Sequence, residues 1–329
     1  MKTKNDMRMK VFFLLAGLFL IWSCPSLVDA AESGYPDRAI SLLVPSPPGG
    51  STDLSARLLA EFMEKYLKQS VIVVNKPGAA GTIGGYALAS AKPDGYTLGH
   101  LMSSVPIPEV FSYFYSAPYS SADIRSISRV HVLALAIVVK GDAPWNSLKE
   151  VIEFARKNPR MKYGHNGKNL VQYMVMSSIA KTEKLTLVDV PFDGDGKQIP
   201  ALLGDHIPIA TVAISSVSSL YDAKKVKILA VLTEKRAEFA PEIPTLQESG
   251  YRLPYPGFVG LFAPKGTSDG IIKKLDDVVR NISADEEYKD KSKKLGLQLA
   301  YQDTVTFTKS LEQLKEELQV FFKEEGLVK

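Results

Sequence analysis

Residues 44–53 read VPSPPGGSTD, and this stretch decides the fold class. It follows the apolar run 39–45, which reads as a buried strand, and it opens the segment 51–67. The apolar residues of that segment recur about one helical turn apart, at Leu54, Leu58, Phe62 and Tyr66. A strand that passes through a glycine pair directly into an amphipathic helix is typical of an α/β unit.

The same alternation continues along the chain and predicts an α/β protein with a mostly parallel sheet covered by helices. Further strands are expected near 71–75, 96–102, 132–139, 161–164, 186–190, 208–214, 227–233 and 257–263. Helices are expected near 82–91, from 147 onward, and near 170–180, 196–203, 268–283 and 303–325. Glu150, three residues after Ser147, is expected to complete a capping box.

The length of 329 residues favours two domains or one large one. Extended segments near 132–139 and 255–263 indicate two crossings between two lobes, each a mixed sheet flanked by helices. We expect residues 33–134 plus 255–329 to form the first, discontinuous lobe, and 135–254 to form the second. Ligands of open α/β sheets bind beyond the carboxyl ends of strands, so loops that follow strands should line a cleft between the lobes.

The first thirty residues predict an export signal. Residues 1–10 are basic, 11–22 are continuously apolar, and 23–30 end in small residues, with a cleavage site expected after Ala30. A periplasmic or otherwise extracytoplasmic location follows. The alternative is a lipoprotein anchored at Cys24, which directly follows the apolar run.

Composition excludes several classes of protein and site. A net charge of +4 is too small for a nucleic-acid-binding surface. The single cysteine rules out an internal disulfide or a cysteine-based metal site, and the four histidines stand at no ligand spacing. We therefore expect no metal, no nucleotide and no other cofactor, because the glycines of 75–84 (NKPGAAGTIG) match neither the dinucleotide fingerprint nor a P-loop. The acidic pair Asp193 and Asp195 fails as a calcium loop, since Lys197 and Gln198 follow.

The glycine pair at 49–50 predicts an anion site. Free N–H groups at a helix start, helped by the helix dipole, hold a carboxylate or phosphate without a cationic side chain. Ser51 and Thr52 add hydroxyl donors. The plain alternative is an ordinary helix start, in which Ser51 or Thr52 only caps its own amides.

An exported enzyme is the rival from another class. A hydrolase needs a nucleophile beside a base, and the sequence contains no GxSxG, no HExxH and no cysteine–histidine pairing. Of the histidines, His165 is the best functional candidate, because its loop should face the cleft. We expect no enzymatic activity.

Three ordered motifs carry a resemblance to a known family: 35–57 (YPDRAISLLVPSPPGGSTDLSAR), 74–84 (VNKPGAAGTIG) and 92–98 (KPDGYTL). The chain closely resembles the periplasmic solute-binding proteins of tripartite tricarboxylate transporters, the TctC or Bug family. The resemblance continues at 190–194, 228–233, 243–250 and 257–266.

This resemblance implies a two-lobed, type II Venus-flytrap protein, expected to be a monomer, that captures a small organic acid and presents it to transporter membrane subunits. A sensory protein that presents the solute to a membrane receptor would have the same fold. The resemblance implies the following ligand-binding residues: Ser46, Pro47, Gly49, Gly50, Ser51, Thr52, Asp53, Asn75, Gly78, Gly81, Thr82, Asn166, Gly167, Lys168, Asn169 and Asp193.

The second half of that set departs from the family pattern. The loop 167–173 (GKNLVQY) lacks the usual Gly-x-Gly-Ser and the histidine shortly after it, and Asp193 stands where a lysine is common. We therefore expect an altered far end of the pocket that recognises something other than a plain di- or tricarboxylate, such as a zwitterionic or hydroxylated acid.

Overall fold

The computed structural model describes residues 34–112, 115–168, 170–233, 235–237, 240–253, 255, 257–324 and 326. The chain separates into two units, Met1–Asp37 and Arg38–Lys329, and every described helix and strand belongs to the second. The predicted signal peptide, its cleavage site and Cys24 lie outside the described residues.

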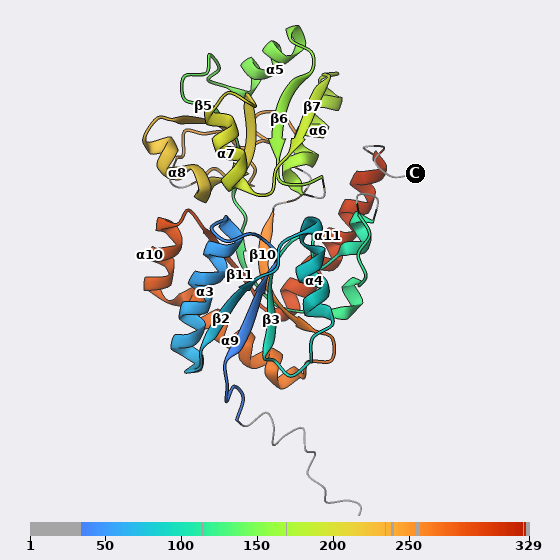
Figure 1. Cartoon of the computed structure of the whole chain (residues 1–329), viewed down its shortest axis with the longest axis vertical. Helices are drawn as coiled ribbons and strands as arrows, with labels where there is room; N and C mark the ends of the chain where they lie inside the picture. The colour runs from blue at the N-terminus through green and yellow to red at the C-terminus, as the bar shows by residue number, and fades with distance from the viewer. Residues whose placement is uncertain are drawn as a thin grey trace, which may run out of the picture. The chain divides into compact units, whose positions relative to one another are not determined.

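The first lobe of this unit is built on a six-stranded sheet with the order β11-β4-β10-β3-β1-β2 (Figure 1). Its strands are β1 (Ile40–Val44), β2 (Val71–Asn75), β3 (Thr97–Met102), β4 (Ile124–Val132), β10 (Phe258–Pro264) and β11 (Gln298–Gln302). Strand β1 is parallel to β2 and β3, whereas β10 is antiparallel to β3 and β4. All seven residues of β10 are buried, as expected for a strand paired on both sides and covered on both faces.

Helices that precede and follow these strands cover the first sheet. They are α3 (Ser51–Leu67), α4 (Thr82–Ala89), α9 (Asp269–Ala284), α10 (Glu286–Lys294) and α11 (Thr304–Glu324). Three short 3₁₀ turns complete the lobe: η1 (Ala79–Gly81), η2 (Pro108–Phe111) and η3 (Ser121–Asp123).

The second lobe has a five-stranded sheet with the order β7-β6-β8-β5-β9. Its strands are β5 (Leu135–Lys140), β6 (Met161–His165), β7 (Leu187–Pro191), β8 (Ile209–Ala213) and β9 (Val226–Val231). Its helices are α5 (Leu148–Lys157), α6 (Val171–Thr182), α7 (Asp195–Leu203) and α8 (Ile214–Asp222). Strand β6 is parallel to β7 and β8, and β5 is antiparallel to β8 and β9.

The two segments that join the lobes are hydrogen-bonded to each other. The chain leaves the first sheet at Val132, enters the second at Leu135, and returns to the first at Phe258. The N–H of Leu133 donates to the carbonyl of Gly257 at 2.7 Å. The outgoing segment 133–134 and the end of the return segment, at Gly257, therefore lie side by side. Paired crossings of this kind allow one lobe to turn relative to the other. The exact lobe boundaries given above stay a prediction.

The elements that the sequence pattern missed are those whose buried residues are polar or few. Strand β4 (IRSISRVHV) buries Ser126, Ser128 and His131, each paired with a residue far away in sequence. Helix α10 buries only Tyr288 and Ser292, so it shows no apolar stripe. Strand β11 and helix α8 were missed as well. The antiparallel pairs of β10 with β3 and β4, and of β11 with β4, make the first sheet mixed, as expected for each lobe.

The expected capping box at the start of α5 forms only in part. Ser147 caps the helix by accepting the N–H of Glu150. The carboxylate of Glu150 accepts the N–H of Asn146 at 2.7 Å, one residue earlier than the motif requires.

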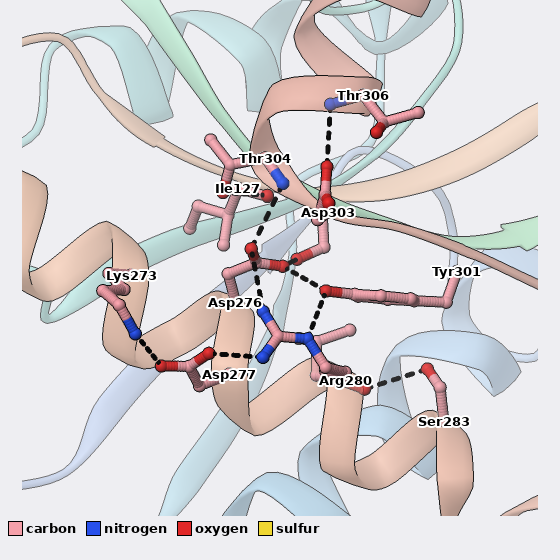
Figure 2. A network of polar contacts seen from close by, with 12 residues as sticks. Ile127, Lys273, Asp276, Asp277, Arg280, Ser283, Tyr301, Asp303, Thr304 and Thr306 are labelled. Atoms are coloured by element: carbon pink, nitrogen blue, oxygen red, sulfur yellow. Dashed lines mark hydrogen bonds and ion pairs between the residues drawn. The ribbon is translucent and has the colours of Figure 1, made fainter.

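A buried carboxylate fixes the C-terminal elements to the first lobe (Figure 2). Asp276 on α9 accepts hydrogen bonds from the hydroxyls of Ser128 at 2.7 Å and Tyr301 at 2.8 Å. It also accepts the N–H of Thr304, the first residue of α11, at 3.2 Å. One side chain therefore joins α9 to β4, β11 and α11.

Among the described helices, none combines the length and the apolar character that a membrane span requires.

Two buried histidines share one serine in the core of the first lobe. The hydroxyl of Ser55 lies 2.9 Å from His100 Nε2 and 2.8 Å from His131 Nδ1. Burial lowers the pKa of each imidazole to about 3, so both are neutral at pH 7. When the chain unfolds, the pKa of each imidazole returns to the ordinary value of about 6.5.

We predict that this pair makes the folded state acid-sensitive. Since the folded-state pKa values are depressed, the unfolded chain binds more protons below about pH 6.5, and stability falls progressively from there toward pH 3. Replacing His100→Gln should make the slope of unfolding free energy against pH shallower by up to about 1.4 kcal/mol per pH unit. Urea unfolding at several pH values measures this slope. His206→Gln, at an exposed position, is the control, and equal slopes for both variants would contradict the assignment.

Candidate functional site

A cavity of about 530 Å³ is lined by residues of both lobes. Most of the residues predicted from the sequence line it: Ser46, Pro47, Gly49, Gly50, Ser51, Thr52, Gly78, Gly81, Asn166 and Asp193. Much of the remaining lining is apolar and includes Met102, Leu133, Leu135 and Leu170. The size and the mixture of apolar walls with few polar groups are typical of a small-molecule site.

Several predicted residues do not line this cavity. Asp53, Asn75, Thr82, Gly167 and Lys168 are absent from its wall, and Asn169 lies outside the described residues. Thr82 donates its hydroxyl to the carbonyl of Ala79 within its own turn. The others hold loops in position, as described below.

The start of α3 presents uncapped amides to the cavity. The N-cap residue is Gly50, which has no side chain to accept a hydrogen bond, and Ser51 and Thr52 are already the first helical residues. The interpretation in which Ser51 or Thr52 caps the helix is therefore wrong. The first N–H groups of a helix have no partner within it, so a negative group in the cavity can accept them. Within the described part of the chain, the buried hydroxyl of Ser46 also has no hydrogen-bond partner.

Asp53, which does not line the cavity, holds this turn in position. Its carboxylate accepts the N–H of Gly49 at 2.9 Å, the Nε–H of Arg57 at 2.9 Å and the amide of Asn75 at 2.8 Å. The same Asn75 amide donates to the carbonyl of Ser46 at 3.0 Å. Asp53 and Asn75 thus fix the backbone of 46–49 against α3 and the end of β2.

The Asp53 carboxylate is held in its ionised form. It is only 1% exposed, and burial acts to raise its pKa. Hydrogen bonds from Arg57, Gly49 and Asn75 outweigh burial and keep the pKa of Asp53 below its usual range. Since Asp53 also engages Arg57, the guanidinium is paired behind the turn.

We predict that Asp53→Ala loosens the turn. The change leaves the Gly49 N–H, the Asn75 amide and Arg57 without their acceptor, which should lower the free energy of unfolding by about 1–3 kcal/mol. Urea unfolding measures the loss. Glu61→Ala, an exposed carboxylate on the same helix, should change stability by less than about 0.5 kcal/mol. Equal losses for the two variants would show that Asp53 has no special role.

The second glycine segment contributes close packing. A Cβ at Gly81 would lie 2.8 Å from Val105, and one at Gly84 would lie 2.8 Å from Pro45. These glycines let the start of α4 approach the end of β1, where the cavity begins. Ala79 and Ala80, which also line the cavity, adopt left-handed φ angles of 46° and 56°. Such a backbone is costly for alanine, and strained residues of this kind cluster at ligand sites.

In the second lobe, the central polar residue is Asp195, which was not among the expected ligand residues. It is the first residue of α7, lines the cavity and is 6% exposed. Its Oδ1 accepts from Asn166 at 2.6 Å, and its Oδ2 accepts from the N–H of Ala213 at 3.0 Å and the hydroxyl of Ser216 at 2.7 Å. The available signal was its position at the start of an expected helix.

Lys168 and His165 form a separate group beside the cavity. His165 is fully buried, accepts the N–H of Gly167 at Nδ1 and lies 3.3 Å from Asp189 through Nε2. The ammonium of Lys168 lies 3.2 Å from the same Asp189. Burial lowers the pKa of His165, although Asp189 opposes the shift. Neither side chain lines the cavity, so this group supports the loop that carries Asn166.

The cavity therefore has two chemically different ends. The first-lobe end offers amide and hydroxyl donors and no cationic side chain among its described residues. Such a helix start binds carboxylates and other anions. The second-lobe end carries Asp193, Asp195 and Lys197. No three metal-ligating side chains gather anywhere in the described ranges.

Residues 55–327 match the sequence model of the family described as the tripartite tricarboxylate transporter family receptor. A UPF0065 protein of Bordetella pertussis is 31% identical over 84% of this chain and 85% of its own length. The protein BugT of the same species is 30% identical over 82% of this chain and 83% of its own length.

Solved structures show the same architecture. The periplasmic binding protein BugD is 28% identical, with a TM-score of 0.81 over 89% of this chain and 99% of that one. MatC from Rhodopseudomonas palustris with bound malate (24% identical, TM-score 0.77, 87% and 99% covered) shares the fold. So does an R. palustris protein with adipate (22%, 0.82, 89% and 98%). The two-lobed periplasmic-binding-protein fold implied by the sequence is confirmed.

Proposed function

This chain belongs to the tripartite tricarboxylate transporter receptor family, and from that premise we propose what it binds and to what it delivers. It is an extracytoplasmic solute-binding protein that captures a small organic acid by its carboxylate. It then presents the acid to the membrane subunits of a tripartite tricarboxylate-type transporter. The lobes are expected to divide as 33–134 plus 255–329 and 135–254.

The observation that carries the proposal is the uncapped start of α3 in the wall of the interlobe cavity. Four features act together there: the Gly50 N-cap, the amides of Ser51 and Thr52, the Ser46 hydroxyl and the dipole of a 17-residue helix. A carboxylate bound at this point gains hydrogen bonds to donors that otherwise lack protein partners.

Two structural neighbours hold dicarboxylates, adipate in one and malate in the other. Their identity to this chain is below 25%, so that likeness supports the fold alone. The choice of a carboxylate for this protein rests on its own loop 46–52.

Lobe closure is the proposed working motion. Leu133 lines the cavity and is hydrogen-bonded to Gly257, so the two crossings move as one hinge. Closure around a solute buries its carboxylate between α3 and the second lobe, which shields the charge from water and strengthens its hydrogen bonds.

We propose that the site binds and releases its solute unchanged. A hydrolytic step needs a nucleophile activated by a base. The described residues of the cavity wall include Ser46 and Ser51, and no histidine or cysteine is among them. The Ser55 hydroxyl does contact two histidines, but all three are buried in the core.

The most direct variant of the carboxylate end is Gly50→Leu. The backbone of Gly50 (φ −80°) suits any residue, and a Cβ there meets only the carbonyl of Pro47 at 3.8 Å. The leucine should fold normally and fill the space in front of the amides. We expect carboxylate affinity, measured by titration calorimetry, to fall by about tenfold or more.

Ser70→Leu places the same side chain at an exposed position outside the cavity and is the control. Unchanged affinity in the Gly50 variant, with unchanged thermal stability, would remove the start of α3 from the site.

Delivery to the transporter is tested with reconstituted membrane subunits. Uptake of a radiolabelled acid that binds the protein should require the purified protein, and Gly50→Leu should reduce uptake in parallel with affinity. Uptake that proceeds equally without the protein would contradict the transport role. Solute binding that persists in that case would fit the sensory alternative.

A further inference from the structure

The second-lobe end of the cavity already contains a carboxylate in the place where a second ligand carboxylate would be expected. Three donors converge there: the Asn166 amide, the Ala213 N–H and the Ser216 hydroxyl. All three are taken by Asp195, which is also the first residue of α7 and so receives the favourable field of that helix start. The carboxylate of Asp195 therefore already accepts the hydrogen bonds that a solute anion would need.

The supporting residues leave Asp195 little freedom to move away. The carbonyl oxygen of Asn166 accepts the amide of Gln198 at 2.9 Å. The side-chain oxygen of Gln198 accepts the N–H of Thr211 at 3.0 Å. Gln198 and Thr211 are fully buried, so Asn166 is held with its NH₂ toward Asp195. A solute cannot displace Asp195 without breaking this network.

Among its described contacts, the carboxylate of Asp195 is stabilised by hydrogen bonds but is not neutralised by a cation. Its described contacts are all with neutral donors, and burial raises the pKa of Asp195 in spite of them. The one cationic side chain among the described lining residues is Lys197, which lies 3.2 Å from the carboxylate of Asp193 just before α7. Both side chains are exposed. An ionised carboxylate accepts about four hydrogen bonds, so Asp195 keeps acceptor capacity on Oδ1.

We propose that this end of the cavity binds a protonated amino group of the solute. The solute is then zwitterionic, with its carboxylate at the start of α3 and its ammonium against Asp195. The inference rests on the proposed function, because it takes as given that the solute's carboxylate binds at the start of α3.

The charges of the cavity favour an ammonium over a hydroxyl and over a second carboxylate. A second carboxylate would meet a buried negative charge, with the local donors already occupied, and the repulsion and desolvation would both oppose binding. A hydroxyl would fill one acceptor position of Asp195 but leave the negative charge uncompensated. An ammonium fills the acceptor position with a charge-assisted hydrogen bond and also neutralises the charge of Asp195.

A series of matched solutes tests the inference on the wild-type protein. 4-Aminobutyrate, glutarate, 4-hydroxybutyrate and butyrate differ essentially in the group at one end, and 5-aminopentanoate with adipate repeats the comparison at greater length. α-Amino acids cover the case in which the two charges are close together. Titration calorimetry should give an amino acid that binds at least about tenfold more tightly than the matched dicarboxylate and the matched hydroxy acid.

Asp195→Asn tests which residue is responsible, and Asp205→Asn is the control. Asp195→Asn should weaken binding of the amino acid by about tenfold and narrow the preference for the amino acid over the dicarboxylate. Asp205→Asn should leave both affinities nearly unchanged, because Asp205 is exposed, paired with Lys140 and outside the cavity wall. Thermal unfolding checks that each variant folds. If Asp195→Asn does not fold, the series of solutes on the wild-type protein still decides the class of solute.

The outcomes separate this inference from the proposed function. Tighter binding of dicarboxylates, or equal binding of hydroxy acids, would overturn the ammonium site and leave the carboxylate site intact. Unchanged amino-acid binding in a folded Asp195→Asn variant would overturn the assignment to Asp195. If no acid of any kind binds, the proposed function itself fails.

Discussion

The carboxylate of Asp53 determines whether the rest of the site can exist. It holds the N–H of Gly49, the amide of Asn75 and Arg57 on the side of the turn away from the cavity. The turn between β1 and α3 therefore takes one shape, and the amides of the first helical residues are left facing the cavity without a cap. A cation that would otherwise attract solute anions, Arg57, is paired behind the loop. In the proposed function, this end recognises a carboxylate through backbone geometry and not through a cationic side chain.

The second lobe uses the same chemistry for a different purpose. A helix start and a set of converging donors occur there too, but the carboxylate that fills them belongs to Asp195. The two lobes thus offer opposite electrostatic surfaces to one cavity, donors on one side and an acceptor on the other. In the proposed closure, the paired crossings at Leu133 and Gly257 bring these two surfaces toward a common solute.

The sequence was sufficient for the α/β class and for most of the residues that the first lobe contributes to the cavity wall. The helix 51–67 and the strand 71–75 have the predicted bounds, because their apolar residues follow the period of the element. It was insufficient where burial is polar: β4 buries two serines and a histidine that pair with side chains distant in sequence. The roles of Asp53 and Asn75 were also beyond it, since the chain around them reads the same whether they face a ligand or a loop. Asp195 was seen only as a failed calcium ligand, because its partners Asn166, Ala213 and Ser216 come from three other segments.

A crystal structure of the protein with its bound solute would show whether the start of α3 holds a carboxylate. We expect density between the lobes, with a carboxylate oxygen within about 3.2 Å of the amide nitrogens of Ser51 or Thr52 and no cationic side chain beside it. A solute whose carboxylate lies elsewhere, with those amides contacting only water or packed hydrocarbon, would contradict this expectation.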